Sequence, residues 1–180
     1  MIGADDRLLS VPGTMAAMAT TDVRMVAVVD VDGVVADVRH RLRHVTDRPK
    51  DWRRFFAGAA DDPLLPEGEE TVRRLAEVYD IVYLSGRPER LRGVTEDWFR
   101  VHELPEGPLL LRPHDDHRPA RFFKVQVLRE LAENRTVVVL VDDDPRVLDE
   151  ARAAGFDVLP ATWVGEHSAL REAQERDGRT

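Results

Sequence analysis

Short apolar runs alternate along the chain with longer stretches in which an apolar residue recurs every three or four positions. The short runs are rich in β-branched residues, as buried strands are, and the longer stretches have the period of helices. The pattern predicts strands over residues 24–30, 81–84, 108–111, 136–141 and 158–159. It predicts helices over residues 51–57, 67–78, 88–102, 119–133 and 145–154. This alternation predicts an α/β fold in which helices flank both faces of a parallel sheet.

The two ends of the chain lack this pattern. Residues 1–22 are mostly small and weakly patterned, and we expect a flexible N-terminal extension there. Residues 23–165 are expected to form one domain, followed by a polar C-terminal tail over 166–180. A polar, basic stretch over about 37–66 follows the first strand, and we expect it to form a small insert in this domain.

Composition narrows the class of protein. The chain has 180 residues and a formal net charge of -8, so contact with nucleic acid would have to be local. It contains no cysteine, which excludes disulfides, zinc–thiolate sites and cysteine nucleophiles and fits a reducing, cytoplasmic location. No apolar stretch reaches the roughly 20 residues that span a bilayer, so we expect no membrane association. The sequence carries no signal for an oligomeric state.

Carboxylates follow two of the most apolar predicted strands. Asp30 and Asp32 end the first, and Asp142 and Asp143 end the fourth. Buried strands avoid unpaired charges, and open α/β sheets bind their ligands at the carboxyl ends of the strands. A divalent cation held by oxygen ligands would account for these acids. We therefore expect a Mg²⁺ site at this edge of the sheet.

A hydroxyl and a guanidinium join the acids at the same edge. The predicted strand over 81–84 leads directly into Ser85, Gly86 and Arg87. In phosphoryl transfer a metal neutralises phosphate charge, donors hold the oxygens, and a carboxylate can act as the nucleophile. The residues at these strand ends match that requirement.

These features resemble the haloacid dehalogenase-like (HAD) superfamily of aspartate-nucleophile phosphatases over most of the chain, from Val23 to about Trp163. The resemblance implies a three-layer, Rossmann-like parallel sheet with a minimal cap. The motifs that carry it are Val29-Asp30-Val31-Asp32-Gly33, Tyr83-Leu84-Ser85-Gly86-Arg87, a lysine best matched by Lys124, and Leu140-Val141-Asp142-Asp143.

The resemblance also implies catalytic and metal-binding roles. Asp30 would attack phosphorus and form an aspartyl-phosphate, and Asp32 would protonate the leaving oxygen and then activate water. Mg²⁺ would lie between Asp30, the Asp32 backbone carbonyl and Asp142. Asp143 would be either a further ligand or a partner of the ligands, and the sequence does not decide which.

A closer resemblance is to the 3′-phosphatase domain of polynucleotide kinase-phosphatases. That branch has Ser-Gly-Arg as its second motif, matched by Ser85, Gly86 and Arg87, and a basic residue after the first motif, matched by Arg41. These residues, with Lys124, would bind the phosphate and the substrate. The phosphate-binding loop of the kinase half, Gly-x-x-x-x-Gly-Lys, is absent from this sequence. Some relatives carry an acid shortly before the lysine, where this chain has Ala120.

Several residues have a purely structural alternative. Lys124 could be a solvated helix residue, and Arg41 could equally be a surface arginine. The basic and aromatic residues after the first motif, among them Trp52 and Phe55, could cradle an anionic nucleotide chain or pack inward. We expect Asp144 to cap the helix that starts at Pro145. The run from His114 to His117 is interpreted as a polar loop rather than a metal site.

The sequence thus predicts a Mg²⁺-dependent phosphomonoesterase acting on a phosphorylated substrate, with a nucleic-acid 3′ end as the first choice. A phosphatase for a small nucleotide or sugar phosphate is the alternative within enzymes. A non-catalytic module that grips an anionic partner is the alternative outside them. The intact pair Asp30 and Asp32 argues against that module.

Overall fold

A five-stranded parallel sheet forms the centre of the molecule. The computed structural model describes residues 25–46 and 49–165, so the expected N-terminal extension and C-terminal tail lie outside the described residues. The strand order is β3-β2-β1-β4-β5, and every neighbouring pair is parallel. The strands are β1 (Met25–Val29), β2 (Asp80–Pro88), β3 (Leu109–Arg112), β4 (Thr136–Asp142) and β5 (Val158–Pro160).

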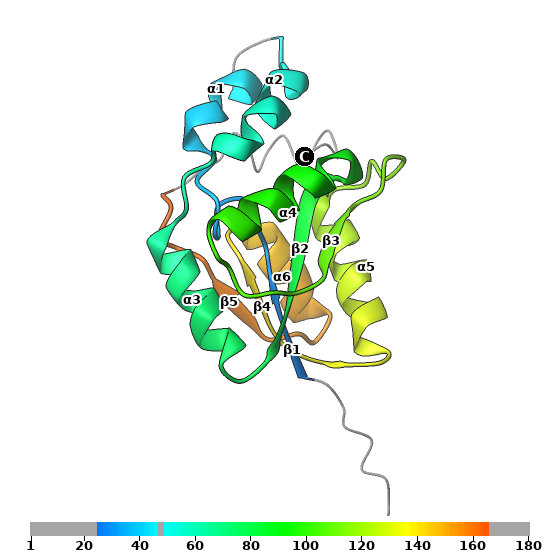
Figure 1. Cartoon of the computed structure of the whole chain (residues 1–180). Coiled ribbons are helices and arrows are strands. Elements are labelled where there is room, and N and C mark those ends of the chain that lie inside the picture. The colour runs from blue at the N-terminus through cyan, green and yellow to red at the C-terminus, as the bar shows by residue number, and fades with distance from the viewer. Residues whose placement is uncertain (1–24, 47–48, 166–180) are drawn as a thin grey trace, which may run out of the picture.

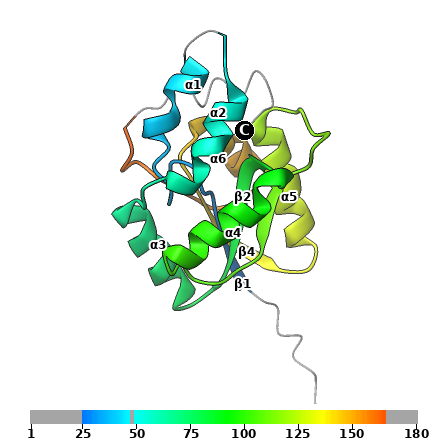
Figure 2. The same ribbon diagram turned by 45° about the horizontal axis from the view of Figure 1, so that its top comes forward.

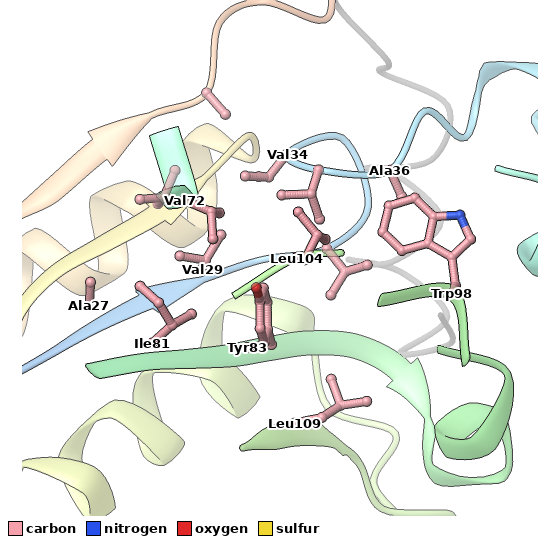
Figure 3. Close-up of a cluster of buried hydrophobic side chains, with 14 of the residues drawn as sticks. Ala27, Val29, Val34, Ala36, Val72, Ile81, Tyr83, Trp98, Leu104 and Leu109 are labelled. Carbon is pink, nitrogen blue, oxygen red and sulfur yellow. The ribbon is translucent and has the colours of Figure 1, made fainter. Parts of the chain in front are cut away.

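Two pairs of helices cover the two faces of the sheet and confirm the three-layer α/β prediction. Their bounds are α3 (Pro66–Ala76), α4 (Arg92–Val101), α5 (Ala120–Ala132) and α6 (Pro145–Ala153). Alternate residues of each strand point to opposite faces. On one face Val72 of α3 and Trp98 of α4 lie in one buried cluster with Tyr83 of β2 (Figure 3). On the other, Phe123 of α5 and Val147 of α6 lie in a second buried cluster with the remaining strand residues.

The last helix begins at the cap that the sequence predicts. The Asp144 carboxylate accepts a hydrogen bond from the Arg146 N–H, so Asp144 caps α6, and Pro145 occupies its first turn. Gly155, with φ of +90°, lies just beyond α6. Within the described residues no helix has the length and apolar character needed to cross a membrane.

Four short helices lie between β1 and α3, and we call residues 39–61 the helical insert. They are η1 (Arg39–Arg41), α1 (Arg43–Thr46), α2 (Trp52–Ala57) and η2 (Gly58–Asp61). Figure 1 and Figure 2 show α1 and α2 at the end of the molecule opposite the start of β1, beyond the carboxyl ends of the strands. Phe55, Phe56 and Val45 of the insert form a small buried cluster with Leu91, which belongs to the 3-10 turn before α4.

The second strand is longer than its apolar pattern predicts. It was expected to stop at Leu84, yet β2 continues to Pro88 and pairs with β3 through Ser85↔Leu111 and Pro88↔Arg112, with an irregularity between them. The following helix correspondingly begins later, as a 3-10 turn over Glu89–Leu91 that leads into α4. The difference arises because the last residues of β2 are polar but buried and hydrogen-bonded, which hydropathy does not reveal.

Candidate active site

The carboxyl edge of the sheet gathers the acids that the sequence places at strand ends. β1 lies between β2 and β4, and the chain order changes direction between β1 and β4. Open α/β sheets form their binding crevice at such a point. Asp30 follows β1 directly and Asp142 ends β4, so both carboxylates lie at this point.

Three carboxylates form a potential metal site. Asp30, Asp142 and Asp143 each place an oxygen within 4.8 Å of the others. The Nζ of Lys124 lies 2.7 Å from Oδ2 of Asp30 and 2.7 Å from Oδ2 of Asp142. One lysine therefore contacts two of the three acids. A cluster of oxygen ligands with excess negative charge is suited to a hard divalent cation.

The position of Lys124 excludes the solvated-helix alternative. Its side chain is 3% exposed and lies between the two carboxylates. Burial lowers the pKa of Lys124, but the charges of Asp142 and Asp30 outweigh this effect and hold the pKa above its ordinary value. Lys124 is therefore a fixed positive charge at the bottom of the site.

One oxygen of Asp30 is free to react or to bind a ligand. Oδ2 contacts Lys124, whereas Oδ1 is buried without a hydrogen-bond partner in the described part of the protein. Burial raises the pKa of Asp30, Lys124 lowers it, and Asp142 and Asp143 raise it again, with a result well above the usual range. A buried oxygen without a partner is costly, so its geometry indicates a place for a cation or an electrophile.

Asp32 is held by two buried arginines. Its Oδ1 accepts hydrogen bonds from Nη2 of Arg41 at 2.9 Å, and from Nε and Nη2 of Arg87 at 3.0 and 2.6 Å. Burial raises the pKa of Asp32, but Arg87 and Arg41 outweigh this effect and lower it. Arg41 is 2% exposed, so the surface-arginine alternative is wrong.

Asp62 completes this ion network, and sequence analysis missed it. Its Oδ2 accepts from Nη2 of Arg41 and of Arg87, both at 2.7 Å, and its Oδ1 accepts from Nε of Arg41 at 2.7 Å. Nε2 of His40 also lies 2.8 Å from Oδ1. Two arginines thus face two buried carboxylates, Asp32 and Asp62. The available signal was an acid directly before Pro63, at the end of the insert, but nothing local distinguishes it from its exposed neighbour Asp61.

The Ser-Gly-Arg segment supplies buried polar groups at the end of β2. Ser85 is 1% exposed, and its Oγ accepts the Arg87 N–H at 3.2 Å. The Arg87 side chain is fully buried, and Nη1 also donates to Thr95 of α4 at 3.2 Å. These contacts fix the guanidinium beside Asp32 before any ligand arrives.

Gly33 allows the loop after β1 to pass close to the acids. It has φ of +80°, a conformation that glycine adopts without strain. A Cβ at this position would lie 2.7 Å from the carboxyl carbon of Asp143. The glycine of the first motif therefore has a steric reason to be there, because any side chain would push Asp143 away.

The remaining candidates lie at the border of this site. Phe55 is fully buried, whereas Trp52 is only partly buried at the surface of the insert. His114 and His117 are exposed on the loop after β3. The cluster of acids that could bind a metal lies elsewhere, at Asp30 and its neighbours.

A comparison with known proteins identifies the family that the sequence matches. The family model described as the polynucleotide kinase PNKP phosphatase domain matches residues 24–162. No curated protein matches the chain.

Solved structures share the fold at low sequence identity. A chain of the Pnkp1/Rnl/Hen1 RNA repair complex superposes with a TM-score of 0.63 at 22% identity, over 86% of this chain and 47% of that chain. The chain thus spans about half the length of that protein. The haloacid dehalogenase-like protein SP0104 from Streptococcus pneumoniae gives 0.55 at 14% identity, over 85% and 92%. The HAD-hydrolase YfnB from Bacillus subtilis, in a structure bound to magnesium, gives 0.51 at 10% identity, over 76% and 87%.

Proposed function

Since the chain belongs to the family of polynucleotide kinase PNKP phosphatase domains, we propose that it is a Mg²⁺-dependent phosphomonoesterase that removes the 3′-phosphate from polynucleotide ends. The family and the fold make it an HAD-type phosphatase domain. The observation that carries the proposed chemistry is the unpartnered Oδ1 of Asp30, beside Lys124 and at the same sheet edge as Asp32.

Asp30 is the proposed nucleophile. Its Oδ1 attacks phosphorus, the bond from phosphorus to the ester oxygen breaks, and an aspartyl-phosphate forms. Lys124 keeps Oδ2 of the same carboxylate in place, and with Ser85 it is positioned to hold phosphoryl oxygens. Water then attacks phosphorus in the second step and releases inorganic phosphate together with the free carboxylate.

Asp32 is the proposed general acid and base. It gives a proton to the leaving oxygen and later takes one from the attacking water. Without substrate, Arg87 and Arg41 hold Asp32 in its ionised form. A phosphate group competes for the same guanidinium donors. The negative charge of the phosphate, placed beside Asp32, raises the pKa of Asp32 toward the range that a general acid needs.

The residues at the site fit Mg²⁺. The carboxylates of Asp142 and Asp143, together with that of Asp30, offer hard oxygen ligands within 4.8 Å of one another, and their combined negative charge favours a cation. When bound, the ion neutralises phosphate charge and acts as a Lewis acid. Oδ1 of Asp142 also accepts the Asp144 N–H at 2.9 Å, which fixes the orientation of this ligand.

Mg²⁺ is expected to stabilise the folded protein. A concentration of 100 times Kd adds about 2.7 kcal/mol. For a protein of this size that raises Tm by about 5–10 °C. Thermal unfolding with Mg²⁺ or with EDTA measures this difference, and Asp143→Asn should reduce it. Asp149→Asn on the exposed side of α6 is the matched control and should keep it. Equal Tm values for the wild type in both buffers would contradict the metal site.

The substrate is tested with a 3′-phosphorylated oligonucleotide, a 3′-mononucleotide, a sugar phosphate and an aryl phosphate. We expect release of inorganic phosphate with Mg²⁺, and the highest kcat/KM on the oligonucleotide. Activity on small esters alone would reject the polynucleotide substrate and favour the small-molecule phosphatase. No release from any ester in any divalent metal would reject the enzyme and favour the anion-binding module.

A further inference from the structure

A cleft of about 490 Å³ is lined in part by Pro88, the residue after Arg87, and has no role in the chemistry described above. Trp52 and Phe56 of α2 form one side, and the loop from Pro113 to His117 after β3 forms the other. Figure 2 shows α2 and this loop at the same end of the molecule. The volume falls within the roughly 300–1,000 Å³ of small-ligand pockets.

The cleft and the ion network of Asp32 and Arg87 involve successive residues of β2. Pro88, which lines it, directly follows Arg87 and pairs in register with Arg112 at the end of β3. Because Pro88 adjoins Arg87 in the chain, the next part of a substrate whose terminal phosphate lies beside Asp32 would come close to this cleft. Pro88 lies at the cleft because β2 extends beyond its apolar run to this residue.

One wall of the cleft is suited to a nucleobase. Trp52 is partly buried and is stacked with Phe56 at a ring distance of 5.8 Å and an angle of 27°. Arg90 places its guanidinium 4.8 Å from the centre of the Phe56 ring. Flat aromatic and guanidinium surfaces bind bases by stacking without regard to sequence.

The opposite wall carries an arginine with unused hydrogen-bond donors. Arg112 is 2% exposed, and Nη1 donates to the Arg118 carbonyl at 2.8 Å, but Nε and Nη2 have no partner in the described ranges of the chain. Burial lowers the pKa of Arg112, so the buried charge is not favoured by its surroundings. Unpartnered buried donors indicate an anion or water that completes them.

The balance of charge in the cleft favours an anion. Asp116 is already neutralised, since its carboxylate lies 2.5 Å from Nη2 of Arg118 and 3.5 Å from Nη1 of Arg112. Asp115 is the remaining carboxylate of the lining, and it is exposed. The lining also contains two positive charges, those of Arg90 and Arg112. With Arg118 counted beside Asp116, three arginines face two aspartates, which leaves one positive charge at the cleft of a protein whose net charge is -8.

We propose that this cleft binds the nucleotide that precedes the phosphorylated 3′-terminal nucleotide, with its base on Trp52 and its phosphodiester facing Arg90 and Arg112. The inference rests on the proposed function, because it assigns a second binding position to the same substrate. It makes the protein an enzyme for polymer ends. The cleft adds affinity only when a second nucleotide is present.

The test compares kcat/KM on a 3′-phosphorylated dinucleotide and on the corresponding 3′-mononucleotide. Wild type should prefer the dinucleotide. Trp52→Ala and Arg90→Ala should each reduce this preference about 5- to 100-fold, as expected for the loss of one stacking contact. The change should appear in KM rather than in kcat. Trp52→Phe should restore the preference, and Arg129→Ala on the exposed side of α5 should not affect it.

The outcomes separate this inference from the proposed function. Hydrolysis of both substrates at equal kcat/KM would overturn the cleft assignment while the phosphatase stands. A preference that neither variant changes would do the same. Because Trp52 also packs on Phe55 and Phe56, Arg90→Ala provides a second variant at an exposed residue outside α2.

If no ester is hydrolysed, the proposed function is rejected. The assignment of the cleft as a nucleotide site is then tested by binding. The probe is then a dinucleotide with a 3′-hydroxyl, and its binding is measured by the quenching of tryptophan fluorescence. Quenching in the wild type that is lost in Trp52→Phe would support the cleft as a nucleotide site. No binding would overturn it.

Discussion

Replacing Asp30 with asparagine is expected to abolish phosphatase activity, with a loss of at least about 10³-fold in kcat. The amide keeps the size of the side chain but removes the nucleophilic oxygen. Steady-state release of phosphate from the best substrate measures the effect. Retention of more than a tenth of the activity would reject Asp30 as the nucleophile.

Stability distinguishes this loss from unfolding. Asp30 lies beside Asp142 and Asp143, and its pKa is raised by burial and by these like charges. Removing its charge relieves that repulsion while Lys124 keeps its contact with Asp142. We therefore expect Asp30→Asn to unfold in metal-free buffer at the wild-type Tm or above it. Inactivity combined with a markedly lower Tm would mean that the carboxylate serves the fold.

Asp62→Ala is expected to destabilise the protein by about 3–5 kcal/mol, the usual cost of removing one partner from a buried ion pair. Asp62 is fully buried and contacts both Arg41 and Arg87, so its loss leaves two buried arginines facing the single carboxylate of Asp32. The free energy of unfolding from equilibrium urea titration measures the change.

Asp61→Ala is the matched control for this prediction. Asp61 precedes Asp62 directly but is exposed at the end of η2, and its replacement should change stability by less than about 0.5 kcal/mol. If the two variants unfolded at the same urea concentration, the ion network would not contribute to stability in the way its geometry implies. Asp62→Asn separates charge from shape, because it keeps the size of the side chain and loses the charge.

The parts of the fold that the sequence predicts are those that depend on local chemistry. An apolar run such as Val26–Val29 is typical of a strand that is buried on both faces. An acid directly after such a strand lies at the edge of the sheet. Asp30 and Asp142 could therefore be brought together from the sequence, although their catalytic roles are still predictions. The end of β2 could not be found in this way, because Ser85 and Arg87 are buried through hydrogen bonds.

Residues whose surroundings depend on distant segments escaped the sequence analysis. Asp62 becomes a buried partner of two arginines only when the insert folds back onto β2. Arg112 follows three leucines at the end of a short strand, and nothing in its neighbours indicates unused donors. Arg41 could be proposed only through a family resemblance, which supplies long-range information that spacing and periodicity lack.

The division of the ion network between the sheet and the insert makes catalysis sensitive to local unfolding. Asp32 and Arg87 lie at the carboxyl edge of the sheet, whereas Arg41 comes from the insert, which contributes only a few apolar side chains to a small buried cluster. Segments with few buried contacts open more readily than the body of a domain. Opening of the insert would release Arg41 from Asp32 while the sheet stays folded. We therefore expect the proposed activity to be lost at the temperature at which the insert opens, below the temperature at which the sheet unfolds.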